Sequence, residues 1–128
     1  MIDIATMQRW LEQSGFAVAT ESSTTLRITH KKKGDHAPFF VQCAENWVLL
    51  SMLPLLIEGK TKPDDLGLRL LAANREMRLA KFALDQEGAV VLCAELPTES
   101  LDYSELDEAT KRMLSYAAAL REELYGEG

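Results

Sequence analysis

The side chains most able to do chemistry gather in one short segment. His30 and His36 flank three consecutive lysines at residues 31–33, and Asp35 and Cys43 are the nearby groups that could join them around a metal. A zinc site needs about four ligands at characteristic spacing, and this segment has no such signature. The lysines could hold phosphate, but no aromatic side chains alternate with them, as a single-stranded nucleic-acid site would favour. We therefore expect an exposed hairpin loop with ordinary histidines and no metal.

Other catalytic patterns are missing from the sequence as well. The serines lie outside any Gly-x-Ser-x-Gly frame, the seven glycines are scattered, and nothing is placed to orient the histidines as a base. Cys43 and Cys93 occupy apolar positions of expected strands, where a free thiol behaves as a small hydrophobic group. A disulfide between them would require adjacent strands in register. The sequence thus predicts a protein that is not an enzyme and uses no cofactor.

Charge and length restrict the class of protein further. The chain has 128 residues, with 20 acidic and 14 basic side chains and a formal net charge of −6, so a phosphate backbone would repel it. Its first residues lack the pattern of a signal peptide, and its longest apolar run, residues 47–57, is too short to span a bilayer. We expect one cytoplasmic domain over residues 1–128, with its core at about 4–124, that binds neither nucleic acid nor membrane.

Hydrophobic periodicity predicts an α+β fold with elements in the order α-β-β-β-β-α-β-β-α. Helical spacing marks residues 4–13, 63–77 and 103–124, and alternation marks strands at residues 16–20, 26–31, 39–44, 47–52, 82–84 and 90–96. Asp3 is placed to cap the first helix, and Asp102 with Glu105 has the spacing of a capping box. Short hairpin connections predict a largely antiparallel sheet with helices packed on it.

The second helix and the fourth strand carry more specific expectations. Pro63 suits the first position of a helix, and the carboxylates of residues 64–65 would follow in its first turn. Gly67 costs helix propensity, which indicates a close backbone approach at that point. Residues 47–52 are apolar on both sides, which predicts a central strand that is covered on both faces.

An apolar segment, residues 53–57 (LPLLI), lies where a surface connection is expected. Large apolar groups are costly to leave in water, so the segment either packs under the second helix as core or meets another chain. The apolar residues of the second helix also spread wider than one sheet-facing stripe requires. The candidate protein-binding or dimer-interface residues are therefore Leu53, Leu55, Leu56, Ile57, Leu68, Leu71 and Met77.

Several runs together resemble the type III secretion chaperone-like fold, which class I secretion chaperones share with the bacterial YbjN-type family. These runs are residues 45–51 (ENWVLLS), 70–74 (LLAAN), 82–88 (FALDQEG) and 90–97 (VVLCAELP), and the likeness spans residues 7–124. The resemblance implies a small homodimer without catalytic residues, either chaperone- or adaptor-like, that shields an apolar or extended segment of a partner protein. The alternative it implies is a YbjN-type regulatory or accessory protein that binds a folded partner or a small ligand.

Overall fold

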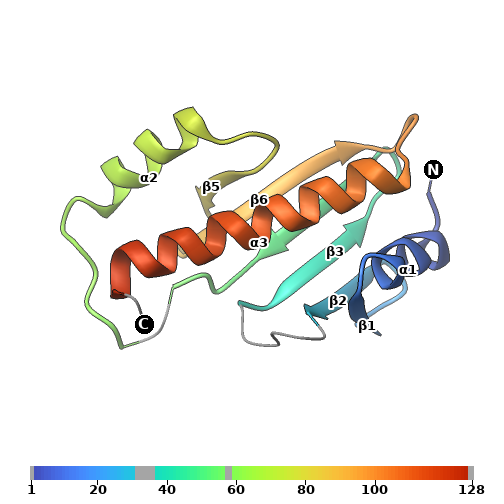
Figure 1. The fold of residues 1–128 in the computed structure, drawn as a ribbon, viewed down its shortest axis with the longest axis horizontal. Helices are drawn as coiled ribbons and strands as arrows, with labels where there is room; N and C mark the ends of the chain where they lie inside the picture. The colour runs from blue at the N-terminus through green and yellow to red at the C-terminus, as the bar shows by residue number, and fades with distance from the viewer. Residues whose placement is uncertain (1, 31–36, 57–58, 127–128) are drawn as a thin grey trace.

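The computed structural model describes residues 2–30, 37–56 and 59–126, and within them a single antiparallel sheet runs in the order β1-β2-β3-β4-β6-β5 (Figure 1). The strands are β1 (Phe16–Thr20), β2 (Thr25–His30), β3 (Phe39–Cys43), β4 (Trp47–Met52), β5 (Lys81–Leu84) and β6 (Val90–Pro97). The helices are α1 (Ile4–Gln13), α2 (Leu66–Glu76) and α3 (Tyr103–Tyr125). The predicted α+β class and the predicted order of elements are confirmed.

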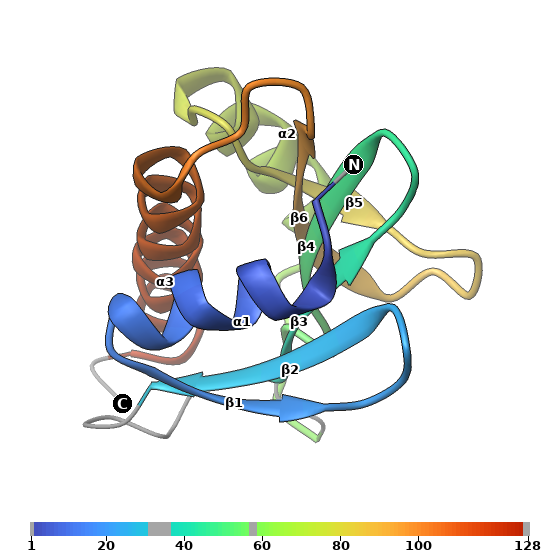
Figure 2. The same cartoon turned by 90° about the vertical axis from the view of Figure 1, so that its right-hand side faces the viewer.

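Helices α1 and α3 lie on the same face of the sheet, as the two views at right angles show (Figures 1 and 2). The alternation predicted for the strands explains this, because every second residue of β3 and β4 is buried toward the helices. Phe39, Val41, Leu50 and Met52 belong to this core. Helix α2 instead packs beside β5, at one edge of the sheet.

No described helix covers the opposite face of the sheet, which carries Phe40, Trp47 and Leu49 and is called the bare face below (Figure 2). Strand β4 is central, between β3 and β6, as predicted. The predicted cover on both of its faces is wrong, since Trp47 is 50% exposed and Leu49 and Ser51 are partly exposed. Helices α1 and α3 both lie on one face of the sheet, and α2 packs beside the edge strand β5. No described helix therefore covers the second face of β4.

The predicted helix caps are confirmed. Asp3 accepts a hydrogen bond of 2.9 Å from the Thr6 N–H at the start of α1. At α3, Asp102 accepts from the Glu105 N–H at 2.9 Å, while the Glu105 carboxylate accepts from the Asp102 N–H at 3.2 Å. Because the Glu105 N–H, and then the Ser104 hydroxyl, donate to its ionised form, the pKa of Asp102 lies below its ordinary value.

Helix α2 begins later than predicted. The Leu66 N–H donates to the Pro63 carbonyl at 3.2 Å, so Pro63 opens a tight turn before the helix. Asp65 is the N-cap residue, and no acidic side chain lies in the first helical turn. The predicted close approach at Gly67 is also wrong, because a Cβ built there would meet no atom within 4 Å. Gly67 instead faces an open hollow.

Candidate functional site

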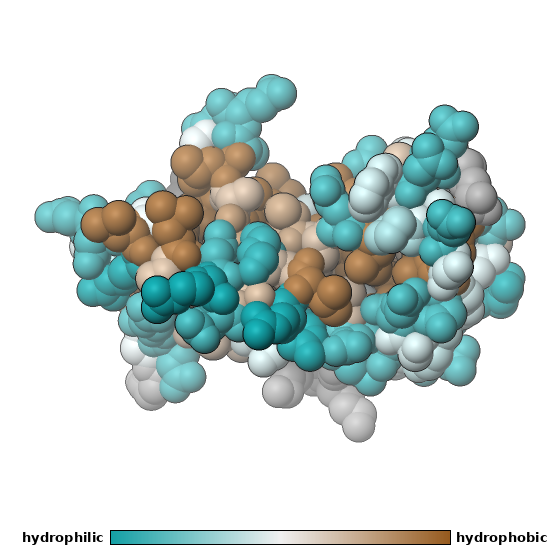
Figure 3. Space-filling view, turned by 90° about the horizontal axis from the view of Figure 1, so that it is seen from above, coloured by the Kyte–Doolittle hydropathy of each residue, from teal (hydrophilic) through white to brown (hydrophobic). Residues whose placement is uncertain are grey.

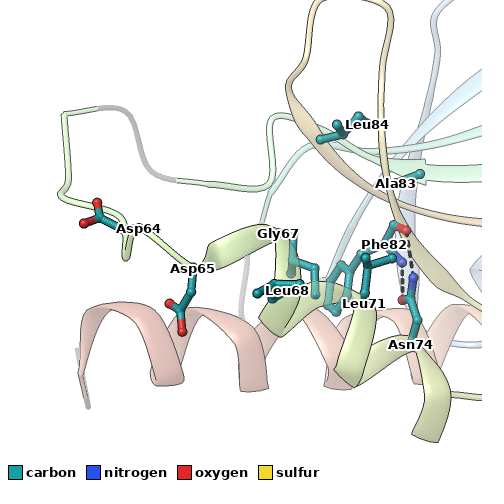
Figure 4. Close-up of a pocket in the computed structure, with 10 residues that line it drawn as sticks. Asp64, Asp65, Gly67, Leu68, Leu71, Asn74, Phe82, Ala83 and Leu84 are labelled. Atoms are coloured by element: carbon teal, nitrogen blue, oxygen red, sulfur yellow. Dashed lines mark hydrogen bonds between the residues drawn. The ribbon is translucent and has the colours of Figure 1, made fainter.

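That hollow is a groove between helix α2 and the edge strand β5, with a volume of about 710 Å³ (Figure 4). Its floor and walls are almost entirely apolar, and carboxylates stand at the end where α2 begins. The lining residues are Asp64, Asp65, Gly67, Leu68, Leu70, Leu71, Asn74, Phe82, Ala83 and Leu84. The helix supplies one wall and the strand the other, so the groove exists only because α2 is held at this edge.

Three leucines of the groove are exposed to solvent. Leu68 and Leu71 of α2 are 72% and 67% exposed, and Leu84 of β5 is 66% exposed. Figure 3 looks down on this side of the molecule, and apolar residues gather at the α2 end of the view. A contiguous apolar surface of this kind is typical of a site that contacts another protein.

Polar contacts fix α2 against β5 at the far end of the groove. The Asn74 side chain donates to the Phe82 carbonyl at 3.1 Å and accepts from the Phe82 N–H at 2.8 Å, and Figure 4 shows both bonds. The Lys81 ammonium donates to the carbonyls of Asn74 and Met77 at 2.7 and 2.9 Å, where α2 ends. These bonds satisfy helix carbonyls that would otherwise lack partners. The C-terminal end of α2 is therefore the anchored end.

Helix α3 also contacts α2 and the connection that leads from α2 to β5. The Tyr116 hydroxyl accepts a hydrogen bond of 2.9 Å from the Arg78 N–H, in the connection from α2 to β5, and this bond is the main reason that the pKa of Tyr116 is lowered. Arg69 bridges the two helices, with its guanidinium 3.0 Å from the Asp65 carboxylate and 3.6 Å from that of Glu123 on α3. Contacts with α3 therefore help to hold α2, and with it one wall of the groove, in place.

The predicted interface residues fall into separate places. Leu68 and Leu71 lie together in the groove, whereas Leu55 and Met77 are buried in the core. Leu53 and Leu56 are partly buried, and Leu56 lines a smaller hollow of about 260 Å³ beside the β5–β6 hairpin. Ile57 lies outside the described residues.

Sequence reasoning did not include Leu84 among the interface candidates. The available signal was its alternation with Phe82, which assigns both side chains to one face of β5. In the structure that face turns toward α2 and the groove, with Phe82 mostly buried and Leu84 exposed. Only the position of β5 at the sheet edge, which the chain order does not reveal, makes Leu84 a surface residue.

Only part of the segment from His30 to His36 falls in the described part of the chain. His36, Asp35 and the lysines at 31–33 lie outside it, and no three described His, Cys, Asp or Glu side chains are grouped so that they could hold a metal ion. Cys43 and Cys93 are free thiols on β3 and β6, which β4 separates. Burial raises the pKa of both thiols, which keeps them protonated and poorly nucleophilic.

Within residues 2–30, 37–56 and 59–126, no helix is both long enough and apolar enough to cross a membrane.

Comparison with known proteins gives one matching family and several solved structures that share one fold. The family model CesT_Tir_1 matches residues 2–123. No curated protein matches the chain significantly. Among solved structures, a chain of the heterodimeric complex ExoU-SpcU, from the type III secretion system of Pseudomonas aeruginosa, is 24% identical with a TM-score of 0.68, and the match covers 98% of both chains.

Two further structures have the same fold. A chain of the HopA1-SchA chaperone-effector complex is 16% identical with a TM-score of 0.69, and 92% of this chain matches 91% of that one. YbjN from E. coli is 17% identical with a TM-score of 0.69, and 95% of this chain matches 92% of that one. At these identities the likenesses establish the fold, and they confirm the secretion-chaperone-like architecture expected from the sequence.

Proposed function

The chain belongs to the CesT_Tir_1 family of type III secretion chaperones, and on that basis we propose that it is a cytoplasmic, non-catalytic module that binds another protein and shields an apolar or extended segment of it. The observation that supports shielding most directly is the face of the sheet that no described helix covers, where Trp47 is 50% exposed and Phe40 and Leu49 are partly exposed. Shielding requires uncovered apolar surface on a stable scaffold, and this face of the sheet offers such a surface.

We assign the groove to a second copy of the chain. The surface carries both projecting leucines and a hollow, so two copies related by a twofold axis can place the leucines of each in the hollow of the other. Burying each leucine side chain contributes about 1.5–3 kcal/mol before the costs of association. The residues that make this contact are Leu68 and Leu71 on α2 and Leu84 on β5.

Leu71→Asp should weaken self-association by about tenfold or more, because it places a charge in the apolar contact. Ala72→Asp is the matched control: Ala72 is the next residue of the same helix, is exposed, and does not line the groove. Sedimentation equilibrium of the purified variants measures the effect. A wild-type chain that stays monomeric at high concentration, or equal association by both variants, would overturn the assignment.

The bare face of the sheet is the second uncovered apolar surface, and we assign the shielded client segment to it. Trp47, Leu49 and Phe40 are half or partly exposed there, and the Arg27 guanidinium lies 5.8 Å from the centre of the Phe40 ring. An aromatic side chain offers a large apolar contact with little loss of conformational freedom. A client laid across the strands would cover these side chains while its polar groups stay near water.

Trp47→Asp should remove at least about half of the protection that the protein gives to an aggregating client, since it replaces the most exposed aromatic side chain of the bare face by a charge. Reduced, unfolded lysozyme at a one-to-one ratio is the test client, and light scattering is the measurement. Ala118→Asp, at an exposed position of α3 on the opposite side of the sheet, is the control for added charge. Equal protection by both variants, or none from the wild type, would contradict the shielding proposal.

A YbjN-type accessory role is the second candidate, and the fold shared with YbjN is the observation that favours it. In that role the chain would bind a folded partner or a small ligand without protecting an unfolded client. The lysozyme experiment distinguishes the two, because only the chaperone-like role predicts protection.

A further inference from the structure

Strand β5 is the last strand of the sheet, and its outer edge faces the groove. Pairing with β6 sets which backbone groups point outward. The Asp85 N–H donates to the Ala89 carbonyl at 2.9 Å, so the backbone groups of Asp85 point inward, toward the β6 side. Ala83, two residues earlier and opposite Val91, points the same way. Since inward and outward groups alternate along an antiparallel strand, the N–H and C=O of Phe82 and Leu84 point away from β6.

The outward groups of Phe82 are already occupied within the chain. The Asn74 amide accepts from the Phe82 N–H at 2.8 Å and donates to its C=O at 3.1 Å. A neighbouring antiparallel strand would make the same pair of bonds with one of its residues. Asn74 therefore takes the place of a strand partner at the middle of the β5 edge (Figure 4).

We propose that Asn74 closes the edge of β5 to strand addition, so that a partner enters the groove by inserting apolar side chains. This rests on the proposed self-association and specifies its mode: the two copies contact through leucines, and their sheets do not join edge to edge. Unprotected edge strands pair readily with other chains, and proteins protect them with local devices of this kind.

The part of the edge that Asn74 leaves open is too short to hold a strand. Leu84 is the last residue of β5, and a turn starts at Asp85, whose carboxylate accepts from the N–H groups of Glu87 and Ala89. Unless it displaced Asn74, an incoming strand could form hydrogen bonds with β5 only through the N–H and C=O of Leu84. Lys81 bonds the carbonyls of Asn74 and Met77 at the end of α2 and makes no bond to the Phe82 backbone groups, which the Asn74 side chain holds.

Asn74→Ala tests the proposal against Lys81→Met as a matched control. Both changes remove two hydrogen bonds between α2 and β5, but only the first exposes the Phe82 backbone. We expect Asn74→Ala to form species larger than the dimer by light scattering on a sizing column, while Lys81→Met keeps the wild-type mass. Identical masses for the two variants would overturn the proposal.

Amide hydrogen exchange gives a test that does not depend on how the variants assemble. In wild-type protein and in Leu71→Asp alike, the Phe82 amide should exchange about fivefold or more slowly than in Asn74→Ala, because its bond lies within one chain. Slow exchange at Phe82 that appears only when the chains associate would show that a second strand makes the bond, and would overturn the proposal. If Leu71→Asp associates as strongly as the wild type, the self-association proposal fails. The exchange rate of the Phe82 amide still tests whether Asn74 closes the edge of β5.

Discussion

Phe39→Ala should lower the free energy of unfolding by about 3–5 kcal/mol, the range for removing a large aromatic side chain from a core. Phe39 is fully buried in β3, where its register partners are Ile28 on β2 and Met52 on β4, both also fully buried. Its ring therefore lies in the layer that joins the sheet to the helices, and alanine would leave a cavity there. Urea denaturation followed by far-ultraviolet circular dichroism measures the loss.

The next residue supplies the control for that experiment. Phe40 is also a phenylalanine of β3, but it points to the bare face and stays partly exposed. Phe40→Ala should cost much less stability, since water already reaches its ring and little cavity can form. Equal losses at the two positions would contradict a sheet that carries helices on one face only.

Local signals explain how much of the fold the sequence could predict. The capping pairs at Asp3 and Asp102 act over three or four residues, and hairpin turns such as the one at Asp85 act over a similar range. Such interactions depend little on the rest of the chain, so the ends of α1 and the order of elements followed from them. The position of β6 between β4 and β5 is a long-range choice, and no local pattern fixes it.

The incorrect prediction for β4 has a physical cause. An apolar residue in a strand looks the same in sequence whether it faces a helix or a partner protein, because both environments exclude water. Leu49 and Trp47 therefore suggested a second covered face, where the structure has an uncovered surface. Under our proposal the same residues are covered only when a client is bound, which reconciles their apolar character with their exposure.

Helix α2 shows the same ambiguity on one element. Leu70 is buried in the core, whereas Leu68 and Leu71 are exposed on the wall of the groove, so the apolar surface of the helix is wider than one stripe. The sequence indicated that width and named both exposed leucines. The sequence could not predict that β5 forms the other wall of the groove. That wall depends on β5 lying at the edge of the sheet and on the hydrogen bonds between the Asn74 side chain and the Phe82 backbone.

Leu55→Ala decides between the two roles that the sequence left open for residues 53–57. Leu55 is 0% exposed, and its carbonyl accepts a hydrogen bond of 3.0 Å from the Arg121 side chain of α3, which holds the segment against the helix. We expect the free energy of unfolding to fall by about 2–5 kcal/mol, as for other buried leucines.

Self-association of Leu55→Ala, measured where the variant is fully folded, should match the wild type, because its side chain does not line the α2–β5 groove. Leu71→Ala should show the reverse, with little loss of stability and weaker association, since a leucine that is 67% exposed contributes mainly when a partner covers it. A Leu55→Ala variant that keeps its stability but fails to associate would instead place this segment at the interface. The pair of variants therefore separates apolar residues that hold the fold together from apolar residues that hold two chains together, a distinction that composition and periodicity cannot make.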